Sequence, residues 1–217
     1  MKIVSISDTH SKHNELEIPE CDLFIHGGDF TYFSNGGESE IIDFLTWFSL
    51  QPAKHKVFIA GNHEVLWESK EQYFKNKIPE GVYYLNDSMV EIDGIKIWGS
   101  PITPYFYGWA YNRNRGEEIK KHWDLIPDDI DILVTHGPAF GIMDKAGNEH
   151  VGCEELLFAL QRVKPKMHLH GHMHRKGHIY NNNIHYFNCA MVNSKYNIVN
   201  KPSLINFDAN GDVITFS

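Results

Sequence analysis

Five short clusters of polar residues in this sequence could together hold metal ions against a phosphate group. In chain order the clusters are Asp8-Thr9-His10, Gly27-Gly28-Asp29, Gly61-Asn62-His63-Glu64, Thr135-His136-Gly137-Pro138 and Gly171-His172-Met173-His174. Taken singly, an aspartate after a strand is commonly a turn residue, and a lone histidine is commonly a hydrogen-bonded structural residue. Five such clusters in one chain, none of them containing a cysteine, favour a shared metal site instead.

The spacing inside two of these clusters suits shared ligation. Side chains two residues apart on an extended backbone point to the same side, so Asp8 and His10 could reach one ion together. By the same reasoning His172 and His174 could approach a common cluster. The spacing therefore predicts that each of the two clusters contributes a pair of converging side chains.

Charge and ligand chemistry indicate two divalent transition-metal ions. Two aspartates, Asp8 and Asp29, and one bridging hydroxide would leave two divalent ions with about one net positive charge, which suits a phosphodiester anion. Histidine, carboxylate and amide oxygen suit Mn, Fe, Zn, Co or Ni better than Ca or Mg, and we expect Mn. The adjacent side chains Asn62 and His63 should point apart, so that one binds metal while the other faces the substrate.

The clusters follow segments that read as buried strands, and helical segments lie between them. The predicted strands that precede the clusters are Ile3–Ser7, Asp22–His26, Lys56–Ala60, Ile130–Thr135 and Met167–His170. Helical spacing of apolar residues predicts helices over Glu40–Leu50, Glu64–Lys75 and Glu154–Val163. Hairpin or turn signals occur in Met89–Trp98 around Asp93-Gly94, at Asn181–Asn183 and at Asn210-Gly211. This order predicts an α/β sandwich with mixed sheets, in which chemistry collects beyond the carboxyl ends of strands.

Length and composition limit the classes of protein to consider. With 217 residues, 42% of them hydrophobic, we expect residues 1–217 to form one domain. The net charge of −8 disfavours nucleic-acid binding through a broad basic face, and no apolar stretch approaches membrane-spanning length. The first apolar run meets Asp8 too early for a secretory signal, so we expect a cytoplasmic location. Three cysteines without CxxC spacing do not indicate a disulfide framework or a thiolate zinc site.

The clusters, in their order from Asp8 to His174, resemble the signature of calcineurin-like metallophosphoesterases: D-x-H, G-D, G-N-H-[DE], a lone H and G-H-x-H. The resemblance implies a four-layer αββα sandwich with two metal ions above the central sheets. It implies a first ion held by Asp8, His10, Asp29 and His174. It implies a second ion held by Asp29, Asn62, His136 and His172, with Asp29 bridging. His63 would then be the catalytic residue beside the leaving-group oxygen.

Longer stretches narrow the resemblance. They are similar to the metallophosphoesterase-domain-containing proteins of vertebrate brain and their microbial relatives, and they read DTHS, IHGGDFT, IAGNHE, GSPITPYFYGWAYNRNRG, DILVTHGP and VGCEELL. Some vertebrate members have glycine at the position of His172. The complete ligand set of this chain therefore implies that both metal positions are filled and that activity is stronger.

The resemblance implies hydrolysis of a phosphodiester, such as a cyclic nucleotide, by attack of a metal-bridging hydroxide. Alternatives are a phosphomonoesterase or phosphoprotein phosphatase and, less favoured, a non-catalytic scaffold. Phosphoprotein phosphatases extend the second motif to G-D-x-x-D-R-G, whereas here Gly28-Asp29 continues as Phe30-Thr31-Tyr32. The intact His63 argues against a scaffold, and the net charge argues against a DNA nuclease. The expected partner is a small phosphoester, in particular a nucleotide.

The aromatic segment Tyr105–Arg115 could decide the substrate. Tyr107 and Trp109 could stack on a nucleobase, and Arg113 could contact phosphate. The alternative is a loop that packs its own aromatics on the sandwich or forms a contact in a homodimer. For Glu64 we favour a structural role in orienting its loop or starting the following helix.

Overall fold

Two six-stranded sheets lie face to face in the computed structural model, which describes residues 1–32, 37–208 and 213–216. The strands of the first sheet, in spatial order, are β16 (Val213–Phe216), β15 (Ser203–Phe207), β1 (Lys2–Ile6), β2 (Cys21–His26), β3 (Ala53–Phe58) and β4 (Val82–Tyr84). Strands β1 to β4 are parallel, whereas β15 and β16 add antiparallel pairs at one edge.

The second sheet repeats this mixed arrangement. Its order is β13 (Gly177–Asn181), β14 (Ile184–Asn188), β12 (Met167–His170), β9 (Ile132–Thr135), β6 (Ile95–Ser100) and β5 (Ser88–Ile92). The four inner strands are parallel, and a hairpin strand pairs antiparallel at each edge. Two short pairs lie outside the main sheets: β7 (Thr103–Pro104) with β8 (Asn112–Arg113), and β10 (Lys145–Ala146) with β11 (Glu149–His150).

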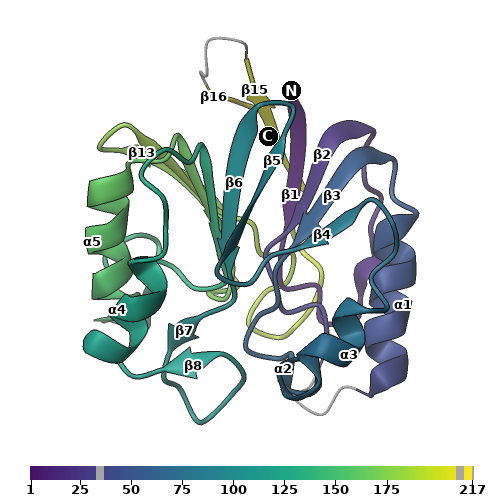
Figure 1. Cartoon of the computed structure of the whole chain (residues 1–217), viewed down its shortest axis with the longest axis horizontal. Helices are drawn as coiled ribbons and strands as arrows, with labels where there is room; N and C mark the ends of the chain where they lie inside the picture. The colour runs from purple at the N-terminus through teal and green to yellow at the C-terminus, as the bar shows by residue number, and fades with distance from the viewer. Residues whose placement is uncertain (33–36, 209–212, 217) are drawn as a thin grey trace.

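Helices cover the outer faces of both sheets, so the expected four-layer αββα sandwich is confirmed (Figure 1). The first sheet is flanked by α1 (Glu38–Ser49), α2 (Val65–Ser69) and α3 (Glu71–Lys75), with the short 3-10 turn His13–Glu15 near α1. The second sheet is flanked by α4 (Glu117–Trp123) and α5 (Glu154–Val163). In the described part of the chain, none of these helices has the length and apolar composition needed to cross a bilayer.

Strand alternation separates two kinds of core. On β2, Leu23 and Ile25 belong to an aliphatic cluster formed with residues of the opposite sheet, because successive side chains point to opposite faces. Phe24 lies between them and packs its ring against Trp47 and Phe48 of α1. The layer between the sheets is therefore mostly aliphatic, and the layer under α1 is rich in aromatic rings.

The sequence predictions hold for most elements. The predicted strands and the hairpin around Asp93-Gly94 are present. Helix α1 buries its predicted apolar face, and α5 buries most of its predicted apolar face. The prediction of one helix over Glu64–Lys75 is wrong, because the backbone leaves helical geometry at Lys70 (φ −131°, ψ 34°). This break lets the rings of Trp67 and Phe74 stack at 5.4 Å between centroids. Helix α4 was not predicted, and the turn predicted at Asn210-Gly211 lies outside the described residues.

The aromatic layer should carry much of the stability of the first sheet. Phe44 of α1 is fully buried and stacks on Phe30 at 4.1 Å, directly after Asp29 in the chain. We predict that Phe44→Ala lowers the free energy of unfolding by about 3–5 kcal/mol, as lost burial and a cavity add together. Phe158→Ala is the control, since this phenylalanine is 64% exposed and its loss should cost less than about 0.5 kcal/mol. Urea denaturation measures both, and equal effects would contradict the prediction.

Candidate metal centre

The loops that follow β1, β2, β3, β9 and β12 meet at the carboxyl ends of these strands. Backbone hydrogen bonds join them: Asp8 N–H donates to Gly28 O at 2.9 Å, and Gly171 N–H donates to His136 O at 3.0 Å. The N–H of His172 reaches across from the second sheet to the carboxylate of Asp8, at 2.9 Å from Oδ1. The two sheets are therefore linked at the point where the five polar clusters converge.

Three of the candidate ligands of the first ion form one tight group. The ligand atoms of Asp8, His10 and His174 all lie within 4.8 Å of one another. His10 Nε2 is 3.1 Å from His174 Nε2, and His174 Nε2 is 3.4 Å from Asp8 Oδ1. Asp29 completes the set, with Oδ2 at 3.9 Å from His10 Nε2.

The candidate ligands of the second ion lie directly beside this group. Ligand atoms of Asp29, His136 and His172 also lie within 4.8 Å of one another. His136 Nε2 is 3.2 Å from Asp29 Oδ2 and 2.9 Å from Asn62 Oδ1. The fold thus brings all seven predicted ligands together around Asp29, while their division between two ions stays a prediction.

The tautomers of two histidines are set for ligation. Nδ1 of His10 lies 3.0 Å from Thr31 O, and Nδ1 of His136 lies 3.0 Å from Gly27 O. Because a carbonyl only accepts, each Nδ1 must carry the proton and donate it. When each ring is neutral, the lone pair of its Nε2 is therefore directed into the cluster, which is the arrangement found in histidines that bind metals.

Both carboxylates of the cluster are almost completely buried. Burial alone would raise the pKa of Asp8, but the hydrogen bond and charge of His174 hold it well below its ordinary value. Burial likewise opposes ionisation of Asp29, whose pKa His136 and His63 hold well below the ordinary range. Two buried negative charges side by side require nearby positive charge, and divalent cations would supply it.

The histidines differ in their readiness to give up a proton. Burial lowers the pKa of His10 and of His172 to about 4, so both are neutral donors near pH 7. Burial opposes protonation of His136 as well, but the charge of Asp29 raises the pKa of His136 to about 9. A cation that binds at Asp29 must therefore displace a proton from His136.

Left-handed backbone geometry, which ordinary residues rarely adopt, recurs at the candidate ligands. The φ angles are 53° at Asp8, 43° at His10, 57° at Asp29, 66° at His172 and 46° at His174. The expectation of extended backbone from Asp8 to His10 and from His172 to His174 is wrong, although these side chains do converge. They converge because each loop turns sharply, at a cost of roughly 1–3 kcal/mol per strained residue.

Two glycines allow the loops to approach the carboxylates. A Cβ at Gly171 would lie 2.0 Å from Asp8 Oδ2, and a Cβ at Gly61 would lie 2.3 Å from Asp29 Oδ1. No side chain fits at such distances, so these two positions require glycine. The close approach is between the backbone and the two carboxylates themselves.

Glu64 joins two of the loops through its buried carboxylate. Oε2 accepts the N–H of Asp29 at 2.9 Å and that of Gly61 at 2.6 Å. Oε1 accepts both the N–H and the hydroxyl of Thr31, each at 2.9 Å. Burial and the charge of Asp29 raise the pKa of Glu64 to about 8. Glu64 is therefore a positioning residue that holds the loop of Asp29 against the loop of Asn62.

A cleft of about 550 Å³ opens beside the cluster. It is lined by Asp29, Asn62, His63, His172 and His174 together with Pro104, Tyr105, Phe106, Trp109, Arg115, Gly137, Pro138, Ala146, Val151, Met173, Ser194 and Tyr196. Of the three predicted substrate residues, Trp109 lies in the cleft, with its ring centroid 4.4 Å from that of His63. Tyr107 is 82% exposed, and Arg113 pairs with Glu68. Neither Tyr107 nor Arg113 lines the cleft.

Sequence reasoning missed Tyr196. Its ring lies edge-on to His10 at 4.7 Å and to His174 at 5.1 Å between centroids. Its backbone has a φ of 60°, and its N–H donates to Asn193 O. The segment carries no motif, so only its left-handed geometry and its position in the fold reveal it. His168 and His170 are buried in β12, the strand that precedes the loop of His172 and His174.

Comparison with known proteins shows to which family this chain belongs. Residues 1–176 match the sequence profile of the calcineurin-like phosphoesterases. The chain belongs to this family. Metallophosphoesterase domain-containing protein 1 of Homo sapiens is 35% identical over 94% of this chain and 70% of its own length. A UPF0046 protein of Caenorhabditis elegans is also 35% identical, over 93% of this chain and 73% of its own length.

Solved structures agree on the fold. Phosphopantetheinyl hydrolase from Mycobacterium tuberculosis superposes with a TM-score of 0.65 at 14% identity, over 90% of each chain. The protein TT1561 of Thermus thermophilus superposes with a TM-score of 0.64 at 13% identity, over 99% of this chain and 97% of its own. Calcineurin-like phosphoesterases hydrolyse phosphoesters at a centre of two divalent metal ions, and the buried donor cluster of this chain fits such a centre.

The role assigned to Glu64 predicts a defect in metal binding. In Glu64→Gln an amide N–H₂ would face donors that now meet a carboxylate oxygen, so the loop of Asp29 should shift. We expect the affinity for Mn²⁺ to fall about 10–100-fold, as for other residues that orient ligands. Glu68→Gln, at a half-exposed ion pair, is the matched control and should bind as wild type does. Calorimetric titration of chelator-treated protein measures both, with circular dichroism to verify folding; unchanged Mn²⁺ affinity in Glu64→Gln would refute this role.

Proposed function

We propose that this chain is a phosphodiesterase that acts on small phosphodiesters, including cyclic nucleotides. The observation that carries the proposal is the character of the cleft. Arg115 is the one lysine or arginine among the described residues that line it, and its guanidinium already contacts the Glu154 carboxylate and the carbonyls of Val151 and Gly152. The cleft therefore has no spare cation for a second phosphate.

The remaining walls suit an apolar, planar substituent. Phe106 and Tyr105 are more than half exposed at the mouth, and Trp109 and Tyr196 lie closer to the candidate ligands. Aromatic rings at a nucleotide site stack on bases of any sequence. A substrate with one phosphate at the metal centre and one base or aryl group in the cleft would satisfy both regions.

The candidate ligands would be divided between two metal ions as the family signature implies. The first ion would be held by Asp8, His10, Asp29 and His174, and the second by Asp29, Asn62, His136 and His172. When bound, two divalent ions supply Lewis acidity that activates water and stabilises charge on the phosphoryl oxygens. The mixture of imidazole, carboxylate and amide donors favours Mn²⁺, with Fe, Zn, Co or Ni as alternatives.

His63 is the residue we assign to the leaving group. Its Nδ1 lies 2.9 Å from Tyr32 O and donates there, so its Nε2 is directed toward the cluster, 3.9 Å from Asp29 Oδ2. A proton held at Nε2 could pass to the departing oxygen. Trp109 packs against the ring and limits its rotation. Because the ligand atoms of His63, His10 and Asp29 lie within 4.8 Å, His63 could instead bind metal, and the test must separate these roles.

The first test compares phosphoester classes. With Mn²⁺ present, we predict faster hydrolysis of bis-p-nitrophenyl phosphate than of p-nitrophenyl phosphate or a phosphopeptide. His63→Ala should lower kcat about 10²–10⁴-fold, the usual contribution of general acid–base catalysis, without lowering the bound metal content. His55→Ala, at the surface of β3, is the histidine control and should leave both unchanged.

Each other outcome of this test has a distinct meaning. Preference for the phosphopeptide would establish the protein phosphatase alternative, and preference for the monoester would establish a phosphomonoesterase. Loss of metal from His63→Ala, measured by elemental analysis, would make His63 a ligand. Absence of hydrolysis by the metal-loaded wild type would favour a scaffold.

The lining of the cleft also predicts that substitutions at Trp109 and Tyr107 have different effects on KM. Trp109→Ala should raise KM for cyclic nucleotides roughly tenfold, because a stacked base is worth about 1–3 kcal/mol, while Trp109→Phe should retain most of the affinity. Tyr107→Ala should leave KM unchanged, since Tyr107 is 82% exposed and does not line the cleft. Steady-state kinetics of the three variants measures this, and equal KM values for Trp109→Ala and Tyr107→Ala would contradict the assignment.

A further inference from the structure

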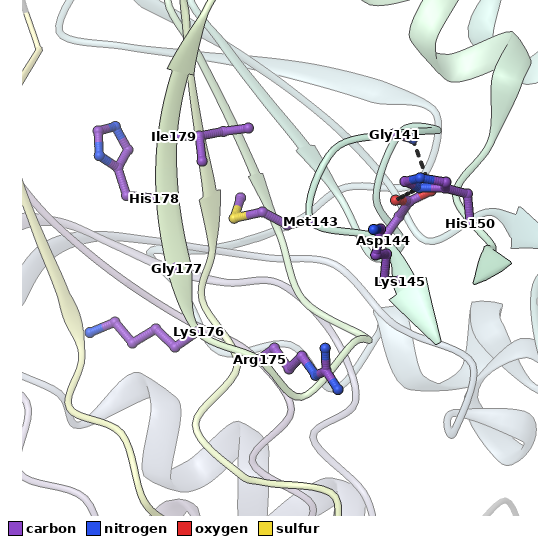
Figure 2. A pocket seen from close by; sticks show the side chains of 10 residues that line it. All are labelled: Gly141, Met143, Asp144, Lys145, His150, Arg175, Lys176, Gly177, His178 and Ile179. Atoms are coloured by element: carbon purple, nitrogen blue, oxygen red, sulfur yellow. Dashed lines mark hydrogen bonds and ion pairs between the residues drawn. The ribbon is translucent and has the colours of Figure 1, made fainter. Parts of the chain in front are cut away.

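A second pocket, of about 440 Å³, lies beside the loop that carries His172 and His174 and shares no lining residue with the cleft (Figure 2). The residues that line it are Gly141, Met143, Asp144, Lys145, His150, Arg175, Lys176, Gly177, His178 and Ile179. They come from the loop before β10, from the β10–β11 pair and from the start of β13. Its volume lies within the range of pockets that bind small molecules.

Two cations in this pocket are free to bind a ligand. Within the described residues, neither the guanidinium of Arg175 nor the ammonium of Lys145 makes a hydrogen bond or an ion pair. Lys176 differs, because its ammonium donates to Lys201 O at 2.6 Å. Arg175 directly follows the candidate ligand His174 in the chain. The two residues nevertheless line different cavities, because Arg175 lines this pocket and His174 lines the cleft.

Among the described residues, one carboxylate lines the pocket, and its hydrogen-bonding capacity is already used. The side chain of Asp144 is fully buried and accepts the N–H of Gly141 at 2.9 Å and that of Gly152 at 3.0 Å. Its other oxygen is 2.6 Å from His150 Nδ1. Asp144 therefore shapes the pocket but is not placed to pair with Arg175 or Lys145.

Between the cations and the sheet lies an apolar wall. Figure 2 shows the side chains of Met143 and Ile179 on the same side of β13 as Arg175, whereas Lys176 and His178 point to the other side. The absence of a side chain at Gly177 leaves room for Met143, whose Sδ would be 3.2 Å from a Cβ there. The pocket thus combines a positive end with an apolar end.

We propose that this pocket binds an organic anion, with its phosphate or carboxylate held by Arg175 and Lys145 and a short apolar body against Met143 and Ile179. The surrounding chain has a net charge of −8, so a region with two unpaired cations, beside one carboxylate that is already hydrogen-bonded, differs from its average surface. Arginine holds such groups through paired N–H donors, and lysine adds a point charge. This site is independent of the proposed phosphodiesterase activity.

The test is calorimetric titration of the full chain with hexyl phosphate, after chelator treatment to keep metal ions out of the cleft. We expect one molecule to bind per chain, at least about tenfold tighter than inorganic phosphate, because the alkyl chain adds apolar burial. Arg175→Ala and Lys145→Ala should each weaken binding about tenfold, the usual effect of losing a hydrogen bond to a charged group.

Two control variants show in which cavity hexyl phosphate binds. Lys121→Ala removes an exposed lysine of α4 and should leave the affinity unchanged. Trp109→Ala alters the cleft and should also leave it unchanged; weaker binding in this variant would mean that hexyl phosphate enters the cleft, and the proposal would fail. It would fail equally if the wild type bound no hexyl phosphate, or if Arg175→Ala and Lys145→Ala bound it as the wild type does.

Vesicles of phosphatidylcholine with and without phosphatidic acid distinguish the source of the anion. Binding to the acidic vesicles that is lost in Arg175→Ala, together with binding of hexyl phosphate, would assign the site to a lipid headgroup. Binding of hexyl phosphate without binding to vesicles would assign it to a soluble organic anion. Vesicle binding that persists in Arg175→Ala and Lys145→Ala, without binding of hexyl phosphate, would overturn the proposal.

Discussion

The burial of two carboxylates at one end of the sandwich is the constraint on which the rest of the site depends. Asp8 and Asp29 are almost completely excluded from solvent, and an uncompensated buried charge costs several kcal/mol. Backbone N–H groups from His172 and His63 and the imidazoles around them supply part of the compensation. A pair of divalent cations would complete it, which explains why so many donors converge where the core could have been apolar.

Holding that arrangement places demands on the loops and on the layers behind them. Left-handed geometry at Asp8, Asp29 and His172 is sterically costly, so the loops must be held from outside. Glu64 does this with three hydrogen bonds to the loop after β2 and one within its own loop. Phe30, the residue after Asp29, is anchored in the aromatic layer under α1. In this part of the molecule, the packing that stabilises the fold therefore also holds the candidate ligands in place.

The loop after β12 has two sides with different chemistry. His172 and His174 are directed toward the metal cluster, while Arg175 turns to the pocket beside β13. Among the described residues, those that line the cleft include several aromatic rings and no spare cation, whereas the second pocket carries two unpaired cations beside a hydrogen-bonded Asp144. This contrast separates a cleft suited to one phosphate on a planar body from a site suited to the anionic end of a different molecule.

The sequence by itself determined the kinds and order of the donors, the strands that precede them and the buried face of α1, because turn chemistry and apolar periodicity are local properties. The tertiary structure alone decided how the donors meet. The turn at Asp8 and His10, the break at Lys70 and the approach of Tyr196 to the histidines depend on contacts between distant segments. A local pattern carries no information on such contacts, since they arise only when the two sheets pack and their loops compete for the same volume.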